Sequence, residues 1–327
     1  MTPERPYPAL SGAGARRLIA SDDRVVVVGA GGWLGMATLE ALSETLGEAF
    51  ERRVVAFGSN ERLLRLRGGH EVCQRPLSAL ATLPSAPSFV LHFAFLTQEK
   101  AKTMSEADYV AANRGISAQV LAALDPIGAT GVFVASSGAV YLVDDPQAES
   151  SKRLYGRLKR MDEAEFSRWA EPERRRAVIA RVFNVSGPYI TKPTSYALGA
   201  FILDALAGGP IGIGATRPVI RSYVAINELM SVVFALLIDG GSGATIFDTA
   251  GLEALEMADI ARAVADAIAP GAAVTRPPIG PYPPDRYVGN SALYQSLRHR
   301  FDVEAVDFLA QMGQTAIYVA EFGRGMS

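Results

Sequence analysis

Short apolar runs rich in β-branched residues alternate, in the first half of the chain, with longer stretches in which apolar residues recur every three or four positions. The first pattern predicts buried strands and the second predicts amphipathic helices. Strands are expected at residues 25–28, 54–57, 89–93, 132–136 and 177–183, and helices at 32–46, 61–66, 107–124 and 155–169. Because this alternation is typical of βαβ units, we predict an α/β fold with a doubly wound parallel sheet of six or seven strands.

The pattern changes beyond Asn184, where glycines and prolines interrupt shorter elements. Helices are expected there at 196–206, 258–268 and 303–318, with short elements near 219–224 and 244–247. We therefore expect a loosely ordered N-terminal extension at 1–22, a main α/β domain at 23–184 and a smaller α/β lobe at 185–327. Residues near 219–250 are candidates to return to the main domain.

Composition and charge narrow the class of partner. The chain has 327 residues, 49% of them hydrophobic, and its 32 basic and 34 acidic residues give a formal net charge of −2. Nothing in this balance suggests a nucleic-acid partner. The single Cys73 excludes an intramolecular disulfide, and three histidines offer no metal-ligand spacing. No apolar run has the length of a membrane span. We expect a soluble, cytoplasmic protein without a metal.

A glycine-rich run, Gly29-Ala30-Gly31-Gly32-Trp33-Leu34-Gly35, ends the first predicted strand and begins the first predicted helix. Glycine permits the tight turn and lets backbone N–H groups approach a diphosphate, whose charge is favoured at a helix N-terminus. The run therefore predicts a dinucleotide site. An ordinary turn with extra glycines is the alternative.

The end of the second predicted strand bears on which dinucleotide is bound. An acidic residue there accepts a hydrogen bond from the adenosine ribose in many NAD-binding proteins, yet Gly58 occupies the position. Ser59 and Arg62 can hold a 2′-phosphate, so NADP(H) is favoured over NAD(H). Two alternatives stay open: Arg62 is a solvated helix charge, or Glu61 bends back to the ribose and restores NAD binding.

Tyr155 and Lys159 lie four residues apart on a predicted helix and therefore share one face. A phenol is a poor base at neutral pH, and a neighbouring ammonium group and the positive nicotinamide favour its phenolate form. Taken alone, the pair also fits an amphipathic helix with an extended lysine. Upstream, a predicted strand ends in Ser136 and Ser137, at the edge where doubly wound sheets bind ligands.

With these motifs in order, the chain from about Arg24 onward resembles the extended short-chain dehydrogenase/reductase family, also called the NAD-dependent epimerase/dehydratase family. Its members have a Rossmann-type fold, and most modify nucleotide sugars. The resemblance is carried by Gly29, Gly32 and Gly35, by the run 91–94, by Asn113 with Gly115, by Ser137, Tyr155, Lys159 and Glu163, and by the segments 181–188 and 221–224.

The resemblance implies roles for individual residues. Ser137, Tyr155 and Lys159 correspond to the catalytic triad. The implied cofactor contacts are Gly29, Gly32, Trp33, Leu34, Gly35, Ser59, Arg62, Phe93, Ala94, Asn113, Tyr155, Lys159 and Phe183, and the implied substrate contacts are Ser137, Asn184 and Arg221. For several of these positions a structural role is the alternative: Asn113 as a support, Asn184 as a loop former and Arg221 as an ion-pair member. His92 is read as a core histidine.

The resemblance also implies hydride transfer in which Ser137 binds the substrate oxygen, Tyr155 transfers the proton and Lys159 orients the ribose. Gly138-Ala139 stands where the dehydratase branch has an acidic pair, so a dehydratase is disfavoured. We predict a reductase that acts on a nucleotide-linked keto sugar. The alternatives are an epimerase that recycles NAD and, from another class, a non-catalytic nicotinamide-binding sensor or scaffold.

Two further expectations concern the partner and the substrate. The family resemblance implies a homodimer formed by two helices, and each of these helices carries apolar positions: Leu158, Met161, Ala164 and Phe166 on one, and Val110, Ile116, Val120 and Leu121 on the other. These residues could instead face the sheet. The link from Tyr141 to Tyr155 is shorter than is usual in the family, which leaves open a substrate other than a nucleotide sugar. The aspartate that contacts adenine after the family's third strand is replaced near Pro76.

Overall fold

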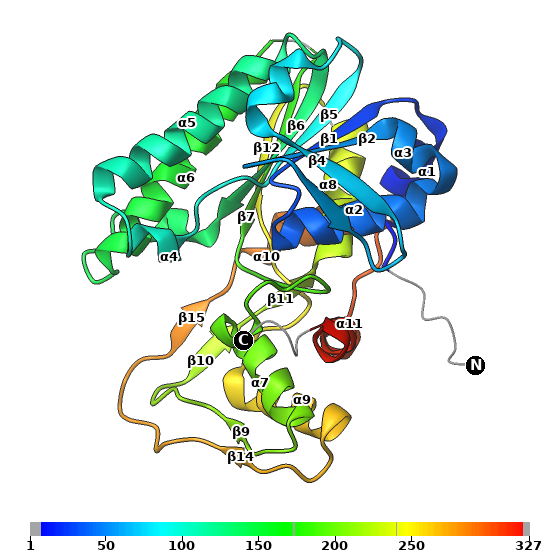
Figure 1. The fold of residues 1–327 in the computed structure, drawn as a ribbon. Helices are drawn as coiled ribbons and strands as arrows, with labels where there is room; N and C mark the ends of the chain where they lie inside the picture. Colours follow the sequence, from blue (N-terminus) through cyan, green and yellow to red (C-terminus); the bar gives the residue numbers. More distant parts are fainter. Residues whose placement is uncertain (1–7, 173, 240, 323–327) are drawn as a thin grey trace.

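The computed structural model describes residues 8–172, 174–239 and 241–322. Within these ranges the main sheet has eight strands in the order β12-β7-β6-β5-β1-β2-β4-β3 (Figure 1). All except β3 run parallel to their neighbours. The strands are β1 (Arg24–Val28), β2 (Val54–Gly58), β3 (Arg62–Arg65), β4 (Glu71–Pro76), β5 (Ser88–His92), β6 (Ala129–Ser137), β7 (Arg176–Val182) and β12 (Gly243–Asp248). The predicted doubly wound, Rossmann-type sheet is confirmed.

Both faces of the sheet are covered by helices, which explains why its central strand is uniformly apolar. In β1, Val25 and Val27 join one hydrophobic core, while Val26 and Val28 join the other. The first core is closed by α2 (Trp33–Leu46) and α8 (Ile226–Asp239), and the second by α5 (Glu106–Leu124) and α6 (Ser150–Trp169), as Figure 1 shows. The helices α2, α5 and α6 confirm helices predicted from the sequence, whereas α8 was not predicted.

The smaller lobe lies beyond one end of this sheet (Figure 1). Its helices α7 (Ala197–Leu206) and α9 (Met257–Ile268) pack on each other around Phe201, Ile202, Ile260 and Val264. Its strands are β8 (Asn184–Ser186), β9 (Ile211–Gly212), β10 (Val219–Arg221), β11 (Tyr223–Ala225), β13 (Leu255–Glu256), β14 (Val274–Thr275) and β15 (Asp285–Tyr287). Between these segments, α8 and β12 return to the main sheet, in the region where the sequence left such a return open.

One predicted element has the wrong type. Within residues 61–66, expected as a helix, Arg62–Arg65 form β3, which pairs with β4 in an antiparallel hairpin. The hairpin turns at Gly69, whose φ of +88° suits glycine, and the amide of Leu66 donates to the carbonyl of His70 over 2.9 Å. Six residues are too few to distinguish the helical period from the strand period. The turn at Gly69 places this segment in a hairpin.

The N-terminal segment also differs from the expectation of a loosely ordered extension at 1–22. Residues 1–7 lie outside the described part of the chain, but α1 (Gly12–Ala20) is a helix that packs on α8. Leu18 is fully buried, and its carbonyl accepts a 2.8 Å hydrogen bond from the guanidinium of Arg53. A Cβ on Gly14 would lie 2.5 Å from the backbone nitrogen of Ala235, so a glycine permits this close approach.

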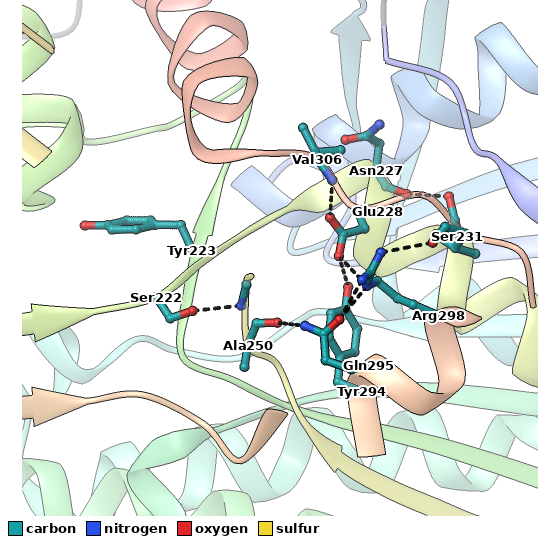
Figure 2. A network of polar contacts seen from close by, with 12 residues as sticks. Ser222, Tyr223, Asn227, Glu228, Ser231, Ala250, Tyr294, Gln295, Arg298 and Val306 are labelled. Carbon is teal, nitrogen blue, oxygen red and sulfur yellow. Dashed lines mark hydrogen bonds and ion pairs between the residues drawn. The ribbon is translucent and has the colours of Figure 1, made fainter. Parts of the chain in front are cut away.

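The C-terminal part contains a helix that the sequence did not predict, α10 (Ser291–Arg300), while the helix expected at 303–318 is α11 (Phe308–Phe322). The segment before α11 is held instead by the buried Glu228 of α8, which accepts from the amide of Val306 over 2.8 Å and from the hydroxyl of Tyr294 over 3.0 Å (Figure 2). Arg298 lies 3.7 Å from the same carboxylate. This network joins α8, α10 and the start of α11.

The remaining elements are short. They are α3 (Phe50–Arg53), α4 (Gln98–Ala101) and the 3-10 turns Gly47–Ala49, Leu77–Thr82, Gly138–Leu142 and Pro193–Ser195. Across the described ranges, no helix has both the length and the apolar character needed to cross a bilayer.

Candidate active site

A cavity of about 800 Å³ opens at the carboxyl ends of the central strands and continues into the smaller lobe. One wall is the glycine-rich turn, represented by Gly29, Gly32, Trp33, Leu34 and Gly35. The floor is formed by the end of β6 with Ser136 and Ser137, and by Tyr155 and Lys159 of α6. The far wall belongs to the smaller lobe and contains Asn184, Tyr196, Phe201, Ile213, Val219, Arg221 and Met257.

The turn after β1 has the shape that a diphosphate requires. Gly29 has a φ of +86°, and a Cβ there would lie 2.5 Å from the backbone nitrogen of Ala94. A Cβ on Gly35 would collide with the carbonyl oxygens of Gly29 and Ala30. Because neither position can hold a side chain, α2 starts close to the strand and its N-terminus faces the cavity. These residues fit a dinucleotide.

Trp33 lies at the mouth of the same wall. Its indole N–H donates to the carbonyl of Pro188 over 2.8 Å, and its ring meets that of Tyr196 edge-on, with 5.0 Å between centroids. Trp33 thus links the glycine-rich turn to the smaller lobe as well as lining the cavity.

The end of β2 is built differently from the sequence expectation. Gly58 packs against the buried amide of Gln74, whose Oε1 accepts from the amide of Gly31 over 3.1 Å and whose Nε2 donates to the carbonyl of Asn60 over 2.8 Å. Gln74 comes from β4 and was not among the predicted site residues. Its hydrogen bond with Gly31 supports the glycine-rich turn.

Arg62 and Ser59 stand beside this support. Arg62 begins β3, opposite Gln74 in the register, and its guanidinium lies directly against Gly31. Ser59 is exposed at the end of β2, with its hydroxyl 3.4 Å from Oδ1 of Asn60. Arg62 is therefore not on a helix, and its charged group lies over the turn that would carry the phosphates.

Ser137, Tyr155 and Lys159 come together on the floor of the cavity. The amide of Ala139 donates to Ser137 Oγ over 3.2 Å, which leaves the serine hydroxyl proton available for another acceptor. Burial raises the pKa of Tyr155 above its usual range, Tyr287 and Tyr109 add to that effect, and a hydrogen bond with Ser137 opposes it. The phenol is therefore protonated at neutral pH.

Lys159 is buried behind Tyr155. Its ammonium group donates a 2.7 Å hydrogen bond to the carbonyl of Ala135 and lies 3.6 Å from the centre of the Phe95 ring. Burial lowers the pKa of Lys159 to about 8, against the attraction of Asp162 and Glu163. At neutral pH the group is mainly protonated, and its positive charge favours the phenolate form of Tyr155.

An ion pair between the buried Glu163 and the half-buried Arg181 lies beside this floor. Glu163, four residues after Lys159, accepts 2.6 Å from Ser136 Oγ, 2.9 Å from Arg181 Nε and 2.7 Å from Arg181 Nη2. Arg181 also donates to the hydroxyl of Tyr141 over 2.9 Å. These contacts join α6 and β6, which present the candidate catalytic residues, to β7.

The segment after β5 contributes to the cofactor wall through its backbone. Phe93 lines the cavity, and the amides of Phe93 and Ala94 donate to the carbonyl of Val28 over 2.8 and 3.1 Å. Asn113 does not line the cavity: its Oδ1 accepts from the amide of Leu96 over 2.7 Å and its Nδ2 donates to the carbonyl of Tyr109 over 3.1 Å. Asn113 therefore positions the loop after β5, as its structural alternative proposed.

His92 ends β5 in the second core, with its ring centroid 5.3 Å from that of Phe166. Burial lowers its pKa to about 3, so it is neutral at pH 7. It does not line the cavity.

The substrate-side residues are engaged with the protein itself. Asn184 Nδ2 donates to the carbonyls of Ser222 and Tyr287 over 3.2 and 3.3 Å. Arg221 is held by Asp285, with 3.1 Å between Nη2 and Oδ2. Phe183 lines the cavity and packs on Tyr287, with 4.7 Å between ring centroids.

Tyr287 contacts this site from outside the described lining of the cavity, and sequence reasoning missed it. Its hydroxyl lies 3.4 Å from Ser137 Oγ, and burial raises its pKa. It occurs in the stretch after the prolines 277–284, where no periodic pattern indicates a strand or a motif. Phe95 and Asp285 were missed because their partners, Lys159 and Arg221, are distant in the sequence.

Comparison with known proteins places this arrangement among known folds. The sequence model of the family described as "NAD dependent epimerase/dehydratase family" matches residues 25–246. No match to the chain was found among curated protein sequences.

Several solved structures share the fold. WbmF of Bordetella bronchiseptica, in complex with NADH, is 17% identical, with a TM-score of 0.70 over 94% of each chain. A UDP-N-acetylglucosamine 4-epimerase of Methanobrevibacter ruminantium M1, in complex with UDP-N-acetylmuramic acid, is 18% identical, with a TM-score of 0.70 over 92% of this chain and 99% of the other. DesIV of Streptomyces venezuelae, a dTDP-glucose 4,6-dehydratase with NAD bound, is 18% identical, with a TM-score of 0.67 over 92% and 98%.

Proposed function

The chain belongs to the NAD-dependent epimerase/dehydratase family, and from that premise we propose that it is an NAD(P)-dependent oxidoreductase that reduces the carbonyl group of a nucleotide-linked keto sugar. The observation that carries the proposal is the meeting of Ser137, Tyr155 and Lys159 on the floor of one cavity, next to a glycine-rich turn that fits a dinucleotide. Several of the similar structures have NADH or NAD bound, WbmF and DesIV among them.

The protonation of these residues suits reduction. A protonated Tyr155 can give its proton to a carbonyl oxygen, and the cation of Lys159 stabilises the phenolate that remains. The Ser137 hydroxyl accepts from the amide of Ala139 and keeps its proton free to donate to the same carbonyl oxygen. The reduced nicotinamide supplies the hydride when it is bound.

The lining of the cavity argues against a dehydratase. Elimination of water needs an acid and a base, and none of the described residues that line the cavity is an aspartate or a glutamate. A side chain on Gly138, where the dehydratase branch has the first of its two acidic residues, would meet the ring of Phe183 at 2.6 Å. A carboxylate at this position would require that ring to move.

We propose NADPH as the preferred reductant. Its support is the guanidinium of Arg62 against Gly31, the exposed Ser59 and the absence of a carboxylate at Gly58. A guanidinium binds a 2′-phosphate through two parallel hydrogen bonds, and NADH has no 2′-phosphate to accept them.

The test is turnover with deuterated cofactor. Purified protein is incubated with NADPH or NADH carrying deuterium at the nicotinamide C4, together with nucleotide 4-keto-6-deoxysugars, and the products are analysed by mass spectrometry. A reductase consumes the cofactor, seen as loss of absorbance at 340 nm, and its product gains one deuterium. Interconversion of nucleotide hexoses by bound NAD, without net consumption, would identify an epimerase instead. Cofactor binding with neither reaction would favour the sensor or scaffold alternative.

A homodimer through α5 and α6 remains part of the proposal. Leu158, Phe166 and Val120 are buried within the chain, so they cannot contribute, whereas Met161 and Ala164 are exposed and Ile116 and Leu121 are half-buried. Light scattering at micromolar concentration tests the dimer, and Met161→Asp is expected to dissociate it. A monomer mass for the unmodified protein would refute it. A cytoplasmic location likewise stays a prediction.

A further inference from the structure

The charges that line the cavity are few. Among the described lining residues, Lys159 and Arg221 are the charged ones. Lys159 lies behind Tyr155 and donates to the carbonyl of Ala135, so its charge serves the catalytic floor. Arg221, at the smaller lobe, is therefore the cation that an anionic part of a substrate would meet. Two other arginines of that lobe, Arg217 and Arg276, do not line the cavity.

Arg221 already has a carboxylate partner. Asp285 accepts from its guanidinium through both oxygens, over 3.3 Å to Nη1 and 3.1 Å to Nη2. The same Nη1 donates to the backbone carbonyls of Ile220 and Asp285, each over 3.0 Å. The guanidinium is thus held on one side by a two-pronged ion pair, the geometry that a phosphate would otherwise adopt.

The position of Asp285 is set by the backbone. β15 runs parallel to β10, with Val219 opposite Asp285 and Arg221 opposite Tyr287. Residues 285 and 287 lie two apart on one strand, so their side chains point to the same face. On that face Asp285 forms an ion pair with Arg221, and the hydroxyl of Tyr287 lies near Ser137 Oγ. Asp285 is not among the described residues that line the cavity, and its exposed carboxylate acts on the cavity through Arg221, which does line it.

We infer that Asp285 is a specificity-determining residue, which limits the negative charge that a ligand can bring to Arg221. The inference rests on the proposed function in that it takes this cavity as the substrate site. A ligand with one phosphate at Arg221 meets a pair whose charges cancel. A diphosphate brings further negative charge beside the Asp285 carboxylate, and each added charge a few ångströms away is repelled even in a partly solvated site.

The inference predicts how affinity depends on ligand charge. The unmodified protein should bind a nucleoside diphosphate no more than about threefold more tightly than the monophosphate, because repulsion from Asp285 cancels the gain from the second phosphate. Removing the charge of Asp285 should raise diphosphate affinity by about tenfold, monophosphate affinity by about threefold and nucleoside affinity not at all.

The experiment is calorimetric titration of the cofactor-saturated protein with uridine, UMP, UDP and inorganic pyrophosphate. Asp285→Asn keeps the size of the side chain and removes its charge, and Asp285→Glu keeps the charge. Asp285→Asn should show the tenfold gain for UDP and a comparable gain for pyrophosphate, and Asp285→Glu should return both affinities toward those of the unmodified protein. Arg221→Met should weaken UDP and UMP binding and leave uridine unchanged.

Other outcomes would overturn the inference. An unchanged UDP affinity in Asp285→Asn, an equal gain for uridine, or no binding of UDP and pyrophosphate to either protein would each do so. Because these titrations require no turnover, their result is separate from the proposed reaction. If Asp285→Asn gains tenfold in UDP affinity but the protein reduces no carbonyl group, the role of Asp285 stands and the proposed reaction is refuted. If the protein reduces a keto sugar but the gain is absent, only the role of Asp285 is refuted.

Discussion

Lys159 donates a 2.7 Å hydrogen bond to the backbone carbonyl of Ala135, two residues before Ser137 on the same strand. This contact connects α6, which carries Tyr155, to the end of β6. The polar groups of the site are thus held in place by the protein itself. Such preorganisation favours catalysis, because little rearrangement is needed when substrate binds.

The buried position of Lys159 predicts a particular dependence of stability on pH. Its pKa is about 8 in the folded protein and about 10.5 in an unfolded chain. Between these values the unfolded chain binds the extra proton, so the free energy of unfolding should rise with pH by about 1.4 kcal/mol per unit relative to a variant without the amine. Below about pH 8 both states are protonated and this contribution is constant.

Urea denaturation of the unmodified protein and of Lys159→Met, from pH 7 to 10.5, measures that difference. The two stabilities should change in parallel up to about pH 8 and then diverge, with the unmodified protein gaining. Arg168→Met on the exposed side of the same helix is the control and should follow the unmodified protein. Parallel profiles for Lys159→Met over the whole range would contradict the assignment of a lowered pKa.

The buried His92 predicts how the free energy of unfolding changes below neutral pH. Its pKa is lowered to about 3 by burial, and it is about 6.5 in an unfolded chain. As pH falls from 6.5 toward 3, the unfolded chain takes up a proton that the folded protein does not, so stability should fall by about 1.4 kcal/mol per unit. His92→Phe should remove this loss in urea denaturation between pH 6.5 and 4. If the variant is as acid-sensitive as the unmodified protein, His92 is not the group responsible.

Glu228 is expected to matter for stability rather than for chemistry. Glu228→Ala leaves the buried guanidinium of Arg298 without its carboxylate and the amide of Val306 without its acceptor (Figure 2). Breaking a buried pair from one side should lower the free energy of unfolding by about 3 kcal/mol. The exposed Glu253→Ala is the control and should change it by less than about 0.5 kcal/mol. Equal effects of the two substitutions would argue against a structural role for the network.

Arg62 should distinguish the two cofactors. Arg62→Ala is expected to raise the KM for NADPH about tenfold, since a charge-assisted hydrogen bond to the 2′-phosphate is lost, and to change the KM for NADH less than about twofold. Arg65→Ala, on the same strand but paired with Glu71, is the matched control. A similar loss with both cofactors would mean that Arg62 only supports the turn at Gly31.

Much of the fold was predictable because its signals are local. The alternation of apolar strands and amphipathic helices correctly indicated the parallel sheet, and the glycine-rich turn has the geometry that its spacing implied. The hairpin at 62–76 was not predictable, since six residues before Gly68-Gly69 fit a helix or a strand equally well. The helix α1 was missed because its few apolar residues, such as Leu18, are buried only by contact with α8.

The site shows the same division. Ser137, Tyr155 and Lys159, which line the cavity, were predicted because they match motifs of the family that the sequence resembles. Gln74 and Tyr287 were missed because each reaches the site across long stretches of chain, to Gly31 and to Ser137 respectively. The pairing of Arg221 with Asp285 likewise depends on a strand contact between residues 64 positions apart.

The central claim is that Tyr155 transfers the proton in the cavity that Ser137 and Lys159 also line. Its most direct test is the rate of NADPH oxidation with nucleotide keto sugars by Tyr155→Phe, measured beside the affinity of the same variant for NADPH. We expect kcat to fall by at least about a thousandfold, and the cofactor Kd to stay within about threefold, because the ring remains and only the proton donor is lost. A variant that keeps a tenth of the original rate would contradict the account.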